Sequence, residues 1–204
     1  MDGLEIKSFA LGLLSANAYL ITDKKSLASV LIDAPEDIAQ VRDYISEHKL
    51  NLKYVILTHA HVDHIQGLPD LQVPFYIHPE DEPLLKDPRL NLSAMFSPLT
   101  VREEARSMKE GDCLFLGSFC FKVIHTPGHT PGSVCLKLNN FLFSGDTLFF
   151  DSIGRSDLPG GDGDLLIDSI KNKLLVLDPE TIVLPGHGNK TTIAREKAKN
   201  PFLL

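Results

Sequence analysis

The chain has 204 residues, 43% of them hydrophobic and 23% charged, which is typical of one globular domain spanning residues 1–204. Its formal net charge of −7 argues against a nucleic-acid partner, because non-specific binding to nucleic acid depends on a basic surface. No apolar run approaches the roughly eighteen residues of a membrane span. Met1–Glu5 lacks the basic start of a signal peptide, so we expect a cytoplasmic protein with no membrane partner.

The first half of the chain predicts strands alternating with helices. Ile38, Val41 and Ile45 recur at helical spacing and favour an amphipathic helix over 36–48. A second helix is expected to begin near Pro79, where acidic residues occupy its first turn. The predicted strands are short runs rich in β-branched and aromatic residues: 4–10, 17–22, 28–33, 54–58 and 75–77.

The second half predicts mainly closely spaced strands. The segments 86–100 and 151–164 are rich in turn-forming residues and are expected to be loops. Helices are expected over 165–177 and around 192–199. The predicted strands of this half are again short apolar runs: 114–116, 119–125, 133–138, 141–143 and 181–184. Two strand-rich halves with helices at their ends suggest two packed sheets with helices outside them.

The three cysteines do not form a recognisable redox or metal motif. Cys113, Cys120 and Cys135 are an odd number and lack C-x-x-C spacing. Each lies among apolar neighbours typical of strands, so we expect reduced core residues, as is usual in the cytosol.

One stretch concentrates potential metal ligands at the end of a predicted strand. The apolar run Val55–Leu57 is followed by His59, His61, Asp63 and His64. Imidazole nitrogens and carboxylate oxygens are the usual ligands of Zn²⁺ and related metals. His59 and His61 are two residues apart, so their side chains point the same way in an extended segment. Taken alone, this stretch is also compatible with a histidine-rich surface turn.

Three further strands end in the same way, with a glycine immediately before a potential ligand. Glycine allows the backbone to turn sharply and to approach other segments closely. The three ligand candidates that follow such a glycine are His129, Asp146 and His187. Four strand ends that carry His or Asp together predict a metal site.

The four motifs together resemble a known family. They read T-H-x-H-x-D-H at 58–64, T-P-G-H-T at 126–130, S-G-D-T at 144–147 and P-G-H-G at 185–188. The set resembles the metallo-β-lactamase superfamily, and most closely the short form of the glyoxalase II-like (hydroxyacylglutathione hydrolase-like) enzymes. The resemblance implies an α/β fold, the αββα sandwich of two mixed β-sheets flanked by helices, which agrees with the predicted elements.

The resemblance also implies a site with two divalent metal ions, in the first place zinc, with iron or manganese as alternatives. By position, the implied ligands are His59, His61 and His129 for the first metal, Asp63, His64 and His187 for the second, and Asp146 as a bridge. Such a pair of cations lowers the pKa of bound water from 15.7 to roughly 7. Asp63 is expected to act in catalysis by orienting the bridging hydroxide that results.

Substrate contacts are less well defined by the motifs. Arg155 resembles the basic position that contacts a substrate carboxylate in glyoxalase II-like enzymes, although a solvated surface arginine is the alternative. Only the 17 residues 188–204 follow His187, so we expect no additional helical C-terminal domain. In longer family members that domain supplies glutathione contacts, so recognition of glutathione stays open.

The leading interpretation is a hydrolase that cleaves a small anionic thioester such as S-lactoylglutathione. A thiolate is a stable leaving group because the thiol pKa is near 8.5, so no general acid is essential. The runner-up is a glutathione persulfide dioxygenase with a single iron, and a lactonase or β-lactamase also fits two metals. A metal-binding scaffold without catalysis is less compatible with the full ligand set, because a structural site needs no open position.

Overall fold

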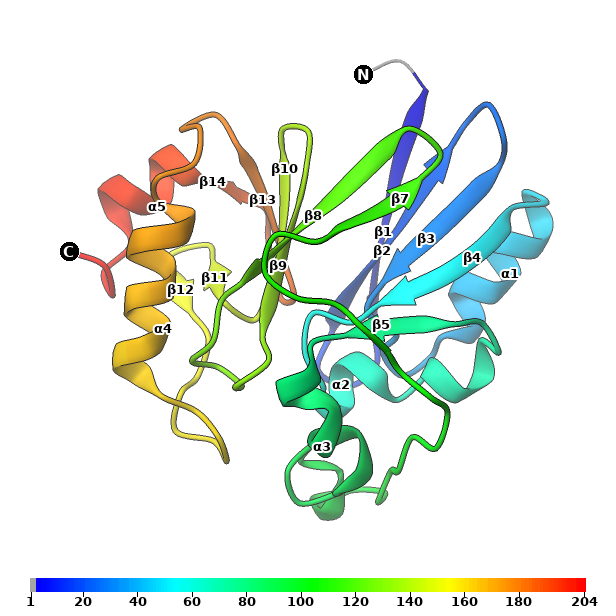
Figure 1. Ribbon diagram of the computed structural model, residues 1–204, viewed down its shortest axis with the longest axis horizontal. Helices are drawn as coiled ribbons and strands as arrows, with labels where there is room; N and C mark the ends of the chain where they lie inside the picture. Colours follow the sequence, from blue (N-terminus) through cyan, green and yellow to red (C-terminus); the bar gives the residue numbers. More distant parts are fainter. Residues whose placement is uncertain (1–2) are drawn as a thin grey trace.

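A computed structural model describes residues 3–204, so Met1 and Asp2, which belong to the segment searched for a signal peptide, lie outside the described residues. Figure 1 shows two β-sheets packed face to face, with α1 on the outer side of one and α4 and α5 on the outer side of the other. The predicted αββα sandwich is therefore confirmed. None of the helices in the described part of the chain has both the length and the apolar character needed to span a membrane.

The first sheet contains six strands in the order of the chain. The strands β1, β2 and β3 are antiparallel neighbours, whereas β3, β4, β5 and β6 run parallel to one another. A parallel pair needs a crossover, and α1 (Ala39–Glu47) supplies it between β3 and β4. The strand bounds are β1 Leu4–Leu11, β2 Ala16–Asp23, β3 Ala28–Ile32, β4 Asn51–Ile56, β5 Phe75–Ile77 and β6 Arg106–Ser107.

The second sheet has the order β14-β13-β10-β9-β8-β7, in which only β10 and β13 are parallel neighbours. Its strands are β7 Cys113–Leu116, β8 Phe119–His125, β9 Val134–Leu138, β10 Phe141–Gly145, β13 Ile182–Pro185 and β14 Thr191–Thr192. A separate hairpin pairs β11 (Leu148–Phe149) with β12 (Ser152–Ile153). The helices outside this sheet are α4 (Gly163–Ser169), which continues into a π turn over Ile170–Leu174, and α5 (Ile193–Lys199).

Side-chain alternation along the strands divides the core into three layers. In β2, Leu20 packs in the layer beneath α1, whereas Ile21 packs between the two sheets. The opposing sheet contributes Phe121 and Phe143 to that central layer. The outer layer of the second sheet buries Leu166 of α4. Both sheets are therefore covered on both faces, which leaves their edges and strand ends for function.

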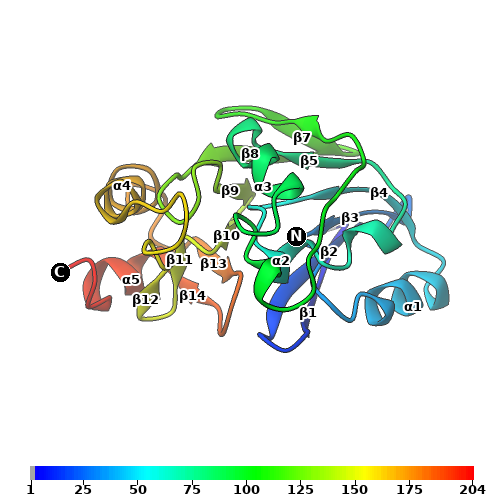
Figure 2. The ribbon, with the colours of Figure 1, turned by 90° about the horizontal axis from the view of Figure 1, so that it is seen from below.

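The ends of several strands meet at one edge of the sandwich. Because β9 is antiparallel to both β8 and β10, these two strands run in the same direction, and β13 runs parallel to β10. Figure 2 looks at the molecule from this edge, where the short helices α2 (Val62–Ile65) and α3 (Glu82–Lys86) lie. The loops that follow β4, β8, β10 and β13 all open here, as the motif positions require.

The structure differs from the sequence-based expectations at a few places. The strands β6, β11, β12 and β14 have two residues each and were not predicted, because two residues show no periodicity. Cys113 and Cys120 form a disulfide between the neighbouring strands β7 and β8, so the expectation of three reduced cysteines is wrong for this pair. Their Cα atoms are 5.5 Å apart, a spacing that the β7–β8 hairpin sets. Cys135 is free and buried, as expected.

Candidate metal centre

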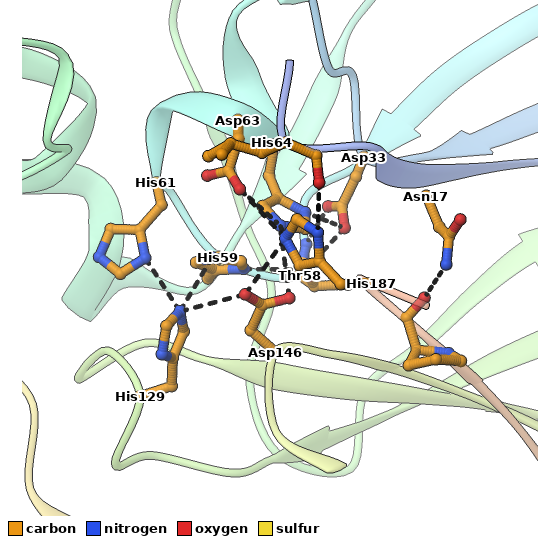
Figure 3. A network of polar contacts seen from close by, with 12 residues as sticks. Asn17, Asp33, Thr58, His59, His61, Asp63, His64, His129, Asp146 and His187 are labelled. Carbon is orange, nitrogen blue, oxygen red and sulfur yellow. Dashed lines mark hydrogen bonds and ion pairs between the residues drawn. The ribbon is translucent and has the colours of Figure 1, made fainter. Parts of the chain in front are cut away.

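The seven residues assigned as ligands from the sequence converge on one point (Figure 3). They come from four loops and a short helix that are far apart in the chain. His59 and His61 follow β4, Asp63 and His64 lie in α2, and His129, Asp146 and His187 follow β8, β10 and β13. The turn from β4 into α2 explains why four ligands fit into six positions.

The first group consists of His59, His61 and His129, which are all buried. His61 Nδ1 lies 2.9 Å from His129 Nε2, and His129 Nε2 lies 3.3 Å from His59 Nε2. Three ring nitrogens therefore face a common point. Extended backbone at His61, whose ψ is 150°, lets both histidines of the pair reach it.

The second group consists of Asp63, His64 and His187. His187 Nε2 lies 3.1 Å from Asp63 Oδ2 and 3.3 Å from His64 Nε2. His64 is fully buried, whereas His187 and Asp63 are partly exposed. The second group is thus the side of the centre that faces solvent.

Asp146 lies between the two groups. Its Oδ1 is 3.4 Å from His64 Nε2, and its Oδ2 is 3.6 Å from both His129 Nε2 and His187 Nε2. One carboxylate thus contacts a histidine of the first group and two of the second. This placement suits a ligand shared by two cations.

Four of the histidines are held by hydrogen bonds on the nitrogen that faces away from the centre. Such contacts fix the ring orientation and the tautomer of a metal-binding histidine. The acceptors are Thr58 Oγ1 for His59 Nδ1 (3.1 Å), Asp33 Oδ2 for His64 Nδ1 (2.9 Å), Arg155 O for His129 Nδ1 (2.7 Å) and Leu14 O for His187 Nδ1 (3.1 Å). The rings are therefore oriented by the protein itself.

Sequence reasoning missed Asp33, which connects both halves of the β4–α2 segment. Its carboxylate accepts hydrogen bonds from Thr58 N (2.7 Å), Thr58 Oγ1 (2.8 Å) and His64 Nδ1 (2.9 Å). The signal was present, because Asp33 directly follows the apolar run of β3 just as the ligands follow theirs. No histidine stands beside Asp33 in the sequence, so the sequence pattern did not mark it as part of a metal site.

The buried carboxylate of Asp81 is a second position that the sequence did not reveal. It accepts hydrogen bonds from Ala60 N (3.0 Å), Thr130 Oγ1 (2.8 Å) and Gly132 N (2.7 Å). Burial raises the pKa of this carboxyl despite those three donors. Asp81 thereby ties the loop that carries His59 and His61 to the loop that carries His129.

Electrostatics separate the protonation states of the seven residues. Burial lowers the pKa of His61 to about 3 and that of His59 well below its usual value. Burial alone would raise the pKa of Asp146, yet the charge on His64 holds it well below its usual range. Burial opposes the charge on His64, but Asp146 and Asp63 raise its pKa well above normal. Metal binding at His64 therefore competes with a proton.

The arrangement passes a simple test for metal ions. Two ring nitrogens at about 2.05 Å from a tetrahedral zinc lie about 3.3 Å apart, which matches the His59–His129 and His64–His187 separations. Two such nitrogens repel each other when neither carries a proton, unless a cation lies between them. Five imidazoles, two carboxylates and no thiolate form a donor set that fits two divalent cations such as zinc, iron or manganese.

Two of the glycines that precede ligands are required by their surroundings. Gly145 has a φ of +47°, and a Cβ there would lie 2.6 Å from Thr58 Cβ. A Cβ on Gly186 would overlap Asp146 Oδ1 and lie 2.9 Å from His64 Cε1. A side chain at either position would therefore displace groups of the centre.

Arg155 lies beside the centre, but its side chain is directed elsewhere. Its backbone carbonyl orients His129, as described above. Its side chain is 68% exposed, and the guanidinium pairs with Asp157 through Nε–Oδ1 and Nη2–Oδ2 contacts of 2.9 Å each. The expected contact between this side chain and a substrate carboxylate stays a prediction.

Comparison with known proteins places the chain among metal-dependent enzymes. The family model described as the metallo-beta-lactamase superfamily matches residues 11–187. A relative named hydroxyacylglutathione hydrolase GloC, from Haemophilus influenzae, is 36% identical over 92% of this chain and 92% of its own.

Solved structures of similar proteins share the fold closely. The BLEG-1 B3 metallo-beta-lactamase is 39% identical, with a TM-score of 0.92 over 98% of this chain and 99% of its own. TTHA1623 in a di-iron-bound form is 38% identical, with a TM-score of 0.85 over 97% and 100%. ETHE1 from Myxococcus xanthus is 29% identical, with a TM-score of 0.78 over 97% and 83%.

Proposed function

The chain belongs to the metallo-beta-lactamase superfamily and is a metal-dependent hydrolase, and from this premise we propose that it cleaves a small anionic thioester such as S-lactoylglutathione. The proposed ligands are His59, His61 and His129 for one metal, Asp63, His64 and His187 for the other, and Asp146 for both. We propose zinc as the metal, with iron as the first alternative because one similar structure is a di-iron form. We further propose that the enzyme acts in the cytoplasm.

The observation that carries the proposal is the position of Asp146 between two groups of ligands, within 3.6 Å of nitrogens in both. A structural metal site is closed and needs a single ion, whereas paired cations are typical of hydrolytic sites. Two bound cations would supply the Lewis acidity that polarises a carbonyl and acidifies a water molecule. The side chains around the metals would orient the water and bind the substrate.

Asp63 is the residue that we propose to orient the attacking water. Burial acts to raise its pKa, but the charge on His64 and a hydrogen bond from His187 lower it, so this carboxylate is ionised at neutral pH. It is also partly exposed, on the solvent side of the centre. An ionised acceptor at the open side can hold a water in one orientation while the substrate enters.

A thioester suits this centre because its leaving group can depart without a proton from the protein. A thiolate is tolerable near its pKa of about 8.5, so departure requires no general acid. An amide would require one, because an amine anion is a far poorer leaving group. The similarity to GloC over nearly the whole chain supports the same choice.

An anionic substrate would use Arg155. The guanidinium is exposed within the loop after Asp146 and is held by the single partner Asp157. A substrate carboxylate could replace Asp157 as the partner of this planar fork, because both present the same two oxygens.

Metal analysis together with a thioester assay tests the proposal. Purified protein should contain two metals per chain and release free thiol from S-lactoylglutathione. The chelated protein should release none and regain activity when two equivalents of zinc are returned. Metal-loaded protein that leaves every thioester intact but opens a lactone or β-lactam ring would contradict the thioester assignment.

A further inference from the structure

An apolar cavity opens beside Asp63, on the solvent side of the metal centre. Its volume is about 200 Å³, and its walls come from the turn between β1 and β2 and from the loop after α3. The apolar side chains that line it are Leu11, Leu13, Leu14, Val62 and Phe96. Four of these five positions lie outside the family motifs of the metal centre, and Val62 occupies an unspecified position of the first motif.

The first wall is a turn with an unusual composition. Ser15 N donates a 3.1 Å hydrogen bond to Gly12 O, which closes a tight turn with Leu13 and Leu14 at its tip. Turn tips usually carry polar residues, yet these leucines are 83% and 55% exposed. Exposed neighbouring large apolar side chains mark a binding surface more often than a structural need.

The second wall faces the first and also displays an apolar side chain. Phe96 follows the short 3₁₀ turn Ser93–Met95 and is 68% exposed. Buried Asn91 holds the base of this loop, because its side chain donates to Leu84 O (2.9 Å) and Leu99 O (3.1 Å).

Hydrogen bonds connect both walls to the metal ligands. His187 Nδ1 donates to Leu14 O, and Val62 N, one residue before Asp63, donates to Asn91 O at 2.8 Å. The cavity is therefore held at a fixed place relative to the second group of ligands. A molecule bound in it is presented to the centre.

The charge of the cavity limits what it can hold. Glu36 and Asp63 are the charged residues on its wall, and no lysine or arginine belongs to the lining that the structure describes. An anionic group would be repelled there and would lack a cationic partner. The anionic half of a thioester must therefore lie elsewhere, and Arg155 is on a different loop.

We propose that this cavity binds the acyl chain of the substrate and that the enzyme prefers thioesters of apolar acyl groups to those of small hydroxyacyl groups. The inference rests on the proposed thioesterase function and specifies its substrate class. Leu13 and Phe96 are the specificity-determining residues. Each methylene that enters such a cavity should raise kcat/KM roughly fourfold, until the cavity is full.

A series of glutathione thioesters with one variable tests the proposal. The lactoyl, acetyl, butyryl and hexanoyl esters share the same thiol, so a rise in kcat/KM along the unbranched acyl series reports the acyl site alone. Leu13→Ser and Phe96→Ser should each lower kcat/KM for the hexanoyl ester by about tenfold and change that for the acetyl ester by less than about twofold. Phe115→Ser is the matched control, because Phe115 is similarly exposed on β7 and does not line the cavity.

The same acyl groups on an uncharged thiol, N-acetylcysteamine, form the second arm. A preference that follows the acyl group on both thiols supports the assignment. A flat acyl series, or a series that the two variants leave unchanged while thiol is released from lactoylglutathione, would overturn the inference and leave the thioesterase function intact. Metal-loaded protein that cleaves no member of either series would instead reject the function itself.

Discussion

Asp146 is the residue on which the two-metal interpretation most depends. It contacts both ligand groups, whereas His187 contacts only the second. Asp146→Ala removes a shared ligand and its negative charge, so we expect this variant to lose nearly all bound metal and His187→Ala to retain about one ion per chain. Elemental analysis of both proteins, purified side by side, measures this. Equal metal losses in the two variants would argue against a bridging Asp146.

Arg155 is predicted to act on substrate binding. We expect Arg155→Ala to raise KM for an anionic thioester by roughly tenfold with little change in kcat, because a uniformly bound contact is lost. Arg155→Lys should recover part of the effect, since the charge survives without the planar fork. Asp157→Asn tests the same contact from the other side. It removes the carboxylate that competes with the substrate for the guanidinium, so it should lower KM. Unchanged KM values in all three variants would return Arg155 to the role of a surface residue whose carbonyl orients His129.

At the level of secondary-structure elements, the strand ends could be predicted and the supporting contacts could not. Apolar runs that end in Gly and a ligand candidate identify the loops after β8, β10 and β13 from the sequence alone. The contacts of Asp33 and Asp81 join segments up to 51 residues apart, and no local pattern encodes such partners. The apolar tip of the β1–β2 turn likewise suggests a function only because the fold places it in the wall of the same cavity as Asp63.

The loop after β13 offers an element-level prediction with a built-in control. Gly186→Ala should displace Asp146 and abolish metal binding, because the new methyl group overlaps Asp146 Oδ1 and crowds His64. Gly188→Ala lies two residues further on, at a φ of +73° with open space around it, and should cost only about 1–2 kcal/mol of stability. Circular dichroism and metal analysis of both variants separate the two effects. Full metal occupancy in Gly186→Ala would show that the close approach is not required.

The whole molecule couples metal binding to folding. The ligands come from both sheets, and ring nitrogens that face each other at 3.3 Å repel each other when neither carries a proton and no cation lies between them. Each metal at a hundredfold excess over its Kd contributes about 2.7 kcal/mol, so removal of two metals by chelation should lower Tm by roughly 10–20 °C for a chain of this size. Differential scanning calorimetry of the same preparation before and after dialysis against chelator measures the shift. An unchanged Tm would mean that the folded chain binds metal no more tightly than the unfolded chain, and would contradict this coupling.

The overall architecture was predictable because periodicity and motif spacing both extend over nearly the whole chain. The sequence patterns predict the αββα order, the strand ends and the seven ligand candidates. The cysteine pair was misjudged, because pairing depends on a hairpin register that composition does not reveal. The acyl group of the substrate was not predictable either, since it depends on surfaces such as the apolar cavity that form only in the folded chain.

The dependence of the reaction on molecular oxygen distinguishes a hydrolase from a dioxygenase most directly. A hydrolase takes its new oxygen atom from water, so thiol release from S-lactoylglutathione should proceed at equal rates with and without oxygen, with zinc sufficient and two metals per chain. One preparation of known metal content should be assayed for this thiol release and, in parallel, for oxygen uptake with glutathione persulfide. Strict dependence on iron, one metal per chain and oxygen uptake without thioester cleavage would contradict the hydrolase and identify a dioxygenase instead.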